Sequence, residues 1–232
     1  LPKLFESTDV IGQAKEEFAY KHKVPKFKVV IGAGDNAASA IGMGIVNEGK
    51  VNISLGTSGT IFIPTNNYIL PKENTLHSFV NTTGKYHLMG CILSAASTRK
   101  WWLENVLVDA DYIQDETDIR NSQNDDLYFL PYLSGERSPH NDVNAKGAFI
   151  GLTHNTTKGD MSKAILEGVA FALRDCLEIA INNGCKFNKA TICGGGSKSE
   201  IWNQIMSNVL NLPIYKSEGS GSFGAALLAL HG

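Results

Sequence analysis

The chain has 232 residues, of which 43% are hydrophobic and 19% are charged, a composition typical of a soluble globular protein with a buried core. Its 21 Lys and Arg residues nearly balance 23 Asp and Glu residues, which leaves a net charge of −2. This balance provides no basic surface for nucleic acid or for an anionic membrane, and we expect neither as a partner.

The sequence also gives expectations about the compartment. No apolar run approaches the roughly 20 residues of a membrane-spanning helix, and no basic-then-apolar leader opens the chain. The four cysteines form no C-x-x-C pair, and three of them (Cys91, Cys176 and Cys193) lie in apolar runs, as buried reduced thiols do. We therefore expect a cytoplasmic protein. Because the chain opens on Leu1-Pro2 without an initiator Met, we expect it to be part of a longer one.

The first part of the chain predicts a linker, strands and a small-residue helix. Residues 1–23 are expected to be a connecting segment with a short helix, followed by a buried strand at residues 27–31. The small residues 37–44 are typical of a helix packed tightly against its neighbours. Two alternating segments, at residues 50–55 and 60–63, flank a glycine-bounded turn and predict a β-hairpin.

The rest of the chain alternates strands and helices. The polar, acidic residues 109–126 are expected to lie exposed on the surface, and an apolar stripe at helical spacing predicts a long helix over residues 160–181. The other expected elements are strands at 86–92, 127–132, 189–193 and 212–215 and helices at 95–106, 201–210 and 219–230. This order predicts one α/β domain over residues 24–232.

A glycine-rich turn, Gly194-Gly195-Gly196-Ser197, follows one of these strands and precedes a helix. Glycines let the backbone approach a ligand closely, and a helix N-terminus offers free N–H groups and partial positive charge to an anion. The turn is neither the G-x-x-x-x-G-K-[ST] phosphate loop nor the G-x-G-x-x-G fingerprint. By itself it fits a nucleotide site and a tight connection equally well.

Two other segments carry groups that suit phosphate chemistry. The hairpin turn Gly56-Thr57-Ser58-Gly59 presents two hydroxyls and adjacent backbone N–H groups, which can donate to phosphate oxygens, although the same residues also suit an ordinary turn. Asp35 follows the first expected strand, between Gly34 and Asn36, where a carboxylate can project into a crevice or simply form a turn.

Loops at one end of an α/β sheet line a shared crevice, so these three segments can face a single ligand. Phosphoryl transfer requires such a set: donors to the phosphates, a carboxylate that orients the acceptor hydroxyl, and exclusion of water. We expect the carboxylate and the two turns to meet around one triphosphate.

Five ordered motifs resemble the FGGY family of carbohydrate kinases. Residues 147–152 followed by 160–167 are similar to the family's second signature, and residues 133–142 resemble the branch of the family that phosphorylates xylulose. The three segments described above occur in the family's order and spacing. The resemblance therefore runs from about Val24 to Leu230.

The resemblance implies an actin/hexokinase-like (ribonuclease H-like) fold, in which this chain is the C-terminal, nucleotide-binding domain of a two-domain sugar kinase. ATP would be the phosphoryl donor, Mg²⁺ a helper and D-xylulose the acceptor. Asp35 would be the catalytic base, with Asn36 beside the sugar. Ser199 stands where relatives carry Asn, and Trp101 or Trp102 is expected either near the nucleotide or in the core. The implied nucleotide-binding residues are Gly56, Thr57, Ser58, Gly194, Gly195, Gly196, Ser199 and Trp101.

One departure from the family bears on activity. Its members open with an Asp-x-Gly-Thr-x-Ser hairpin in an N-terminal domain that also supplies most sugar contacts, and this sequence contains no such segment. We therefore expect the chain alone to be inactive and an N-terminal kinase domain to be its partner, and a homodimer is left open. Two rival hypotheses remain: a kinase for ribulose, gluconate or glycerol, and a non-catalytic sugar- or nucleotide-sensing module.

Overall fold

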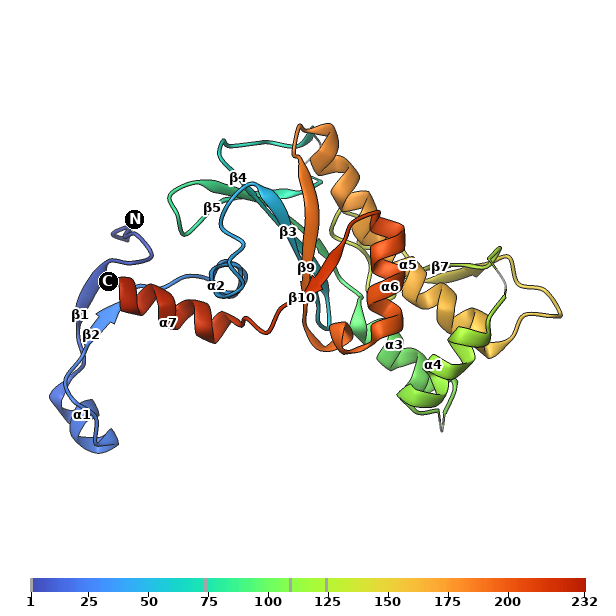
Figure 1. Cartoon of the computed structure of the whole chain (residues 1–232), viewed down its shortest axis with the longest axis horizontal. Helices are drawn as coiled ribbons and strands as arrows, with labels where there is room; N and C mark the ends of the chain where they lie inside the picture. Colours follow the sequence, from blue (N-terminus) through green and yellow to red (C-terminus); the bar gives the residue numbers. More distant parts are fainter. Residues whose placement is uncertain (1, 73–74, 109, 124) are drawn as a thin grey trace.

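A six-stranded mixed sheet forms the centre of the computed structural model, which describes residues 2–72, 75–108, 110–123 and 125–232. Its strand order is β10-β9-β3-β4-β6-β5 (Figure 1). The strands are β3 (Gly49–Leu55), β4 (Gly59–Thr65), β5 (His77–Val80), β6 (Tyr86–Ile92), β9 (Phe187–Cys193) and β10 (Ile214–Lys216). Strands β3, β4, β6 and β5 pair in this order as antiparallel neighbours, whereas β9 runs parallel to β3 and β10 parallel to β9. The predicted hairpin is confirmed as β3 and β4.

The long helix expected over residues 160–181 is confirmed as α5 (Lys158–Asn182). It begins with a capping box, in which the Thr157 hydroxyl accepts from the Asp160 N–H and the Asp160 carboxylate accepts from the Thr157 N–H. Val169 and Leu173 of its apolar stripe are fully buried in the main core between the helix and the sheet. Helix α6 (Glu200–Leu210) packs beside α5 on the same side of the sheet (Figure 1).

Helices α2 (Asp35–Gly42) and α7 (Gly221–His231) pack against each other on the opposite side of the sheet (Figure 1). Ala40 of α2 packs on Phe62 of β4. The two helices approach so closely that a Cβ atom on Gly224 would lie 1.7 Å from the carbonyl oxygen of Ala38. The expectation of a tightly packed small-residue helix is therefore confirmed.

The strand expected at residues 27–31 is present, but the expectation that it is buried is wrong, because it lies outside the central sheet. Strand β2 (Lys28–Val30) pairs only with β1 (Val10–Gln13), and its residues are exposed or half-buried. Helix α1 (Glu16–His22) connects the two strands. A run of β-branched residues predicts strand geometry, but the number of neighbours that cover a strand depends on contacts distant in sequence. The domain boundary expected at residue 23 stays a prediction.

The segment expected to lie exposed at residues 109–126 contains a helix, α4 (Tyr112–Asn121), that buries Asp115 and Ile119. Most of the other described residues of this segment are exposed, so the expectation is confirmed except at these two side chains; residues 109 and 124 lie outside the described residues. Helix α4 follows α3 (Ala96–Trp101), which continues as a π-helix over Trp102–Val106 and confirms the helix expected there. Strands β7 (Tyr128–Leu130) and β8 (Ala148–Ile150) form a separate antiparallel pair. Among the described residues, no helix has the length and apolar character needed to cross a lipid bilayer.

His87 of β6 makes the stability of this fold dependent on pH. The imidazole is 5% exposed, stacks on Phe62 with ring centroids 4.1 Å apart, and leaves Nδ1 without a partner among the described residues. Burial lowers the pKa of His87 to about 4, from an ordinary value of 6.5. Because the unfolded chain binds this proton more readily, the stabilisation from neutral His87 is present above pH 6.5 and is lost as pH falls toward 4.

We therefore expect the free energy of unfolding to fall by roughly 2 kcal/mol between pH 7.5 and pH 5 because of His87. Urea unfolding at both pH values measures this difference. His87→Phe should remove most of it, whereas the exposed His154→Gln should leave it in place. An unchanged pH dependence in His87→Phe would contradict the assignment.

Candidate nucleotide-binding site

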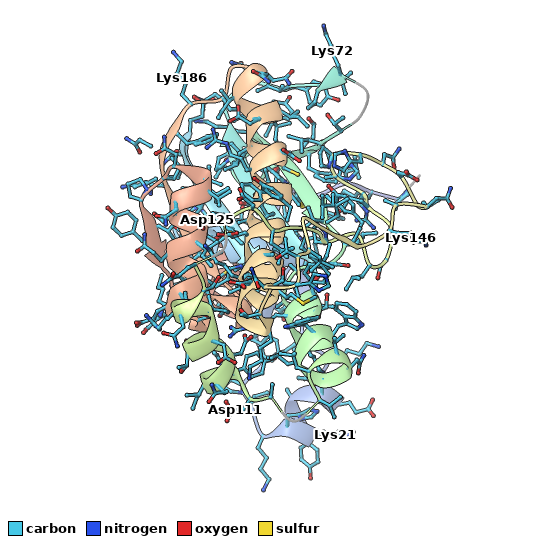
Figure 2. The ribbon with its side chains drawn as sticks, turned by 90° about the vertical axis from the view of Figure 1, so that its right-hand side faces the viewer. Lys21, Lys72, Asp111, Asp125, Lys146 and Lys186 are labelled. Carbon is cyan, nitrogen blue, oxygen red and sulfur yellow. The ribbon has the colours of Figure 1, made fainter. Side chains whose placement is uncertain are left out.

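A cavity of about 750 Å³ lies where the ends of β3 and β9 meet helices α3 and α4. Figure 1 shows these segments gathered at the lower edge of the sheet, and Figure 2 shows Asp111 below helix α4, where it caps that helix. The cavity is lined by residues of the β3–β4 turn, α3, α4, the glycine turn and the start of α6: Thr57, Ala96, Ser97, Arg99, Lys100, Tyr112, Glu116, Gly195, Gly196, Lys198, Ser199 and Trp202.

The β3–β4 turn is held by the start of α3. The carbonyl oxygen of Thr57 accepts hydrogen bonds from the Ala95 N–H (3.0 Å) and from the Ser97 hydroxyl (2.6 Å). The carbonyl oxygen of Gly56 accepts a further bond from the Ala96 N–H at 2.8 Å. With its carbonyl groups occupied in this way, the turn is fixed against α3 at the edge of the cavity.

The glycine turn lies directly against the end of β3. Gly194 has a φ of 90°, and a Cβ there would lie 2.7 Å from the Leu55 carbonyl oxygen, so conformation and space both require glycine. Residues Gly195–Lys198 form one 3₁₀ turn before α6 begins. Because Leu55 immediately precedes the β3–β4 turn, this contact brings the two glycine-bounded turns together. The sequence prediction that they converge is confirmed by their shared cavity.

Sequence reasoning missed the charged wall of the cavity. Arg99 is buried and donates from Nε and from a terminal nitrogen to Asp115 Oδ2, at 2.9 and 2.7 Å. Its guanidinium also lies 3.4 Å from Glu116 and 5.0 Å from the centre of the Tyr112 ring. The available signal was the spacing of Tyr112, Asp115 and Glu116, which places all three on one face of a helix.

Ser199 lines the cavity, but its hydroxyl already has two protein partners. It donates to Glu116 Oε1 at 2.6 Å and accepts from the Trp202 N–H at 3.3 Å as the N-cap of α6. The hydroxyl therefore connects the start of α6 to α4. A direct bond from Ser199 to a nucleotide stays a prediction.

The other predicted site residues lie outside this cavity. Trp101 packs against Trp102 and a separate apolar cluster, and Trp202 is the tryptophan that lines the cavity. Asp35 is the first residue of α2; its exposed side chain accepts from the Asn36 N–H at 2.8 Å. The structure thus brings together two of the three expected segments. The catalytic role of Asp35 and the substrate-binding role of Asn36 stay predictions.

A group of three or more His, Cys, Asp or Glu side chains that could hold a metal ion is not found in the described parts of the chain. Proteins commonly bind Mg²⁺ through one or two carboxylates together with substrate phosphates, which does not require such a group.

A protein-family model for the C-terminal domain of the FGGY family of carbohydrate kinases matches residues 51–232. The chain belongs to the FGGY family. Among curated FGGY relatives, the xylulose kinase of Klebsiella pneumoniae is 38% identical over 99% of this chain and 48% of its own length. Among solved structures, ligand-bound xylulose kinase from Lactobacillus acidophilus is 29% identical with a TM-score of 0.92, and gluconate kinase from the same organism is 30% identical with a TM-score of 0.91.

These solved FGGY structures each cover 98% of this chain, but the chain covers only 48% of theirs. The chain therefore spans about half the length of the relatives that it matches. Its mixed sheet flanked by helices on both sides is the architecture of FGGY kinases, which confirms the actin/hexokinase-like fold predicted from the motifs.

Proposed function

We propose that this chain is the nucleotide-binding half of an ATP-dependent sugar kinase of the FGGY family. The observation that carries the proposal is the cavity at which the β3–β4 turn and the glycine turn meet, beside an ionic wall on α3 and α4. Backbone N–H groups and hydroxyls at such turns suit phosphate oxygens. The whole protein would include an N-terminal domain, in keeping with the length of its relatives.

The two ends of the cavity suit the two ends of a nucleotide. The β3–β4 turn, with its hydroxyls, would face the phosphates. The glycine turn would face the ribose and base, where Glu116 can accept a ribose hydroxyl while Tyr112 offers an aromatic surface. Mg²⁺, bound through the phosphates, would neutralise their charge. Asp35 would take the proton of the acceptor hydroxyl as the phosphoryl group is transferred to it.

The proposed acceptor is D-xylulose, which would be converted to D-xylulose 5-phosphate. Supporting this are the resemblance at residues 133–142 and a 38% identical xylulose kinase. The gluconate kinase at 30% identity keeps a second acceptor class open. A coupled assay of the whole protein with xylulose, ribulose, gluconate and glycerol distinguishes them, and the chain alone is expected to show no turnover.

Nucleotide binding can be tested on the chain itself by thermal unfolding with added ADP or ATP. A ligand at a hundred times its dissociation constant should stabilise the fold by about 2.7 kcal/mol, which corresponds to a rise of about 5–10 °C for a chain of this size. An unchanged melting temperature at millimolar nucleotide would count against the proposal.

A matched pair of variants tests whether the nucleotide-induced rise in melting temperature comes from binding in the cavity. Gly195 lines the cavity, and a Cβ added there meets no atom within 4 Å, so Gly195→Val should obstruct the ligand without disturbing the fold. Gly12 on β1 has equally open surroundings away from the cavity, which makes Gly12→Val the control. The nucleotide-induced shift should disappear in Gly195→Val and persist in Gly12→Val.

A further inference from the structure

The segment at residues 133–142 is fastened to the end of β6 by a buried carboxylate. Glu136 is 2% exposed, and its Oε1 accepts from the N–H groups of Leu93 (2.9 Å) and Arg137 (2.7 Å). The Ser138 N–H donates to the Cys91 carbonyl oxygen at 3.0 Å. These bonds on both sides of Arg137 fix its backbone against the last residues of β6.

The end of β6 is also the neighbour of the β3–β4 turn. In the antiparallel ladder Gly59 pairs with Ile92 and Thr60 with Cys91, so Ser58 lies just beyond the last pair. Burial raises the pKa of the Cys91 thiol, while the charge of Arg137 and hydrogen bonds from Ser58 and Arg137 lower it. The segment that carries Arg137 and the turn that carries Ser58 therefore both lie against the end of β6.

Arg137 is exposed, and within the described residues it forms no ion pair with a carboxylate. The other two arginines that are fixed by side-chain contacts, Arg99 and Arg174, both have carboxylate partners. Burying the Glu136 carboxylate raises its pKa and leaves Oε2 without a partner, which costs stability. The buried Glu136 carboxylate thus fixes the backbone of an arginine that has no carboxylate partner among the described residues.

We propose that Arg137 binds the terminal phosphate groups of the nucleotide beside the β3–β4 turn, and that Glu136 is the residue that positions it. A guanidinium presents its donors in a planar fork that matches phosphate oxygens, and it keeps its charge at any physiological pH. The inference rests on the proposed function, because it assigns a phosphate contact within that nucleotide site.

The test compares AMP, ADP and ATP binding to the chain by titration calorimetry. Arg137→Gln should raise the dissociation constants of ADP and ATP by about 10–100-fold, the usual effect of a hydrogen bond to a charged group, and leave that of AMP nearly unchanged. Arg137→Lys, which keeps the charge but not the fork, should recover part of the loss. Because Arg137 is exposed, the melting temperature without nucleotide should not change.

Lys186→Gln is the charge-matched control, since Lys186 points outward at the far end of the molecule from Asp111 and the cavity (Figure 2). It should bind all three nucleotides as the unmodified chain does. Equal ATP affinity in Arg137→Gln and the unmodified chain would overturn the inference alone, as would an equal loss for AMP and ATP. Failure of the unmodified chain to bind any nucleotide would overturn the proposed function and this inference together.

Discussion

Replacing Asp35 by alanine in the whole protein should lower turnover by about 10²–10⁴-fold while ATP still binds. The loss follows from removing the base that accepts the proton of the sugar hydroxyl. ATP binding should persist because Asp35 lies outside the cavity that the two turns form. Steady-state kinetics with the sugar varied, together with nucleotide titration, measure the two effects separately.

Because Asp35 contributes little to the stability of the fold, its replacement should change turnover without unfolding the protein. Its side chain is exposed, and among the described residues its carboxylate accepts hydrogen bonds from the backbone N–H and the side-chain amide of Asn36 alone. Alanine should therefore cost less than about 1 kcal/mol, mostly from the lost negative charge at the helix N-terminus. Asp35→Asn keeps the shape and should lose turnover equally. Near-normal turnover in either variant would remove Asp35 from its proposed role.

Replacing Asp115 by alanine should destabilise the chain by about 3–5 kcal/mol, because it leaves the Arg99 guanidinium buried without its principal partner. The side chains of this pair are only 5% and 1% exposed. Arg99 also lines the nucleotide cavity, so the variant should weaken ADP binding as well. Urea unfolding gives the stability change, and calorimetry on the folded fraction gives the binding change.

Two further variants test whether the expected loss of stability in Asp115→Ala arises because the ion pair with Arg99 is buried. The pair Lys100–Glu104 is 62% and 60% exposed on the neighbouring helical turns, and Glu104→Ala should cost no more than about 1 kcal/mol. The double variant Arg99→Met, Asp115→Leu replaces the buried pair by apolar groups and should recover most of the lost stability. If Asp115→Ala costs no more than Glu104→Ala, the buried pair does not stabilise this wall.

Local patterns were sufficient where a structural feature depends on neighbours in sequence. The β3–β4 hairpin follows from two alternating segments around a glycine-bounded turn, and α5 from its apolar stripe and its Thr157–Asp160 capping box. The two glycine-bounded turns could be placed at one sheet edge because β3 and β9 are adjacent parallel strands whose ends coincide.

The features that the sequence did not determine depend on contacts between distant segments. Residues 110–123 are polar in composition, yet α4 buries Asp115 because Arg99, 16 residues earlier, neutralises it. Strand β2 resembles a core strand but, among the described residues, belongs to a two-stranded sheet with β1. Arg137 comes to lie at the end of β6 because Glu136 accepts hydrogen bonds from the N–H groups of Leu93 and Arg137.

The sequence by itself thus identified the family of this protein and predicted its chemical groups: two glycine-bounded turns that suit phosphates and a candidate base. Tertiary structure decided which charged groups surround the cavity and left Asp35 outside it. The physical reason is that a buried charge is tolerable only beside its partner, and partners distant in sequence meet only after the chain has folded.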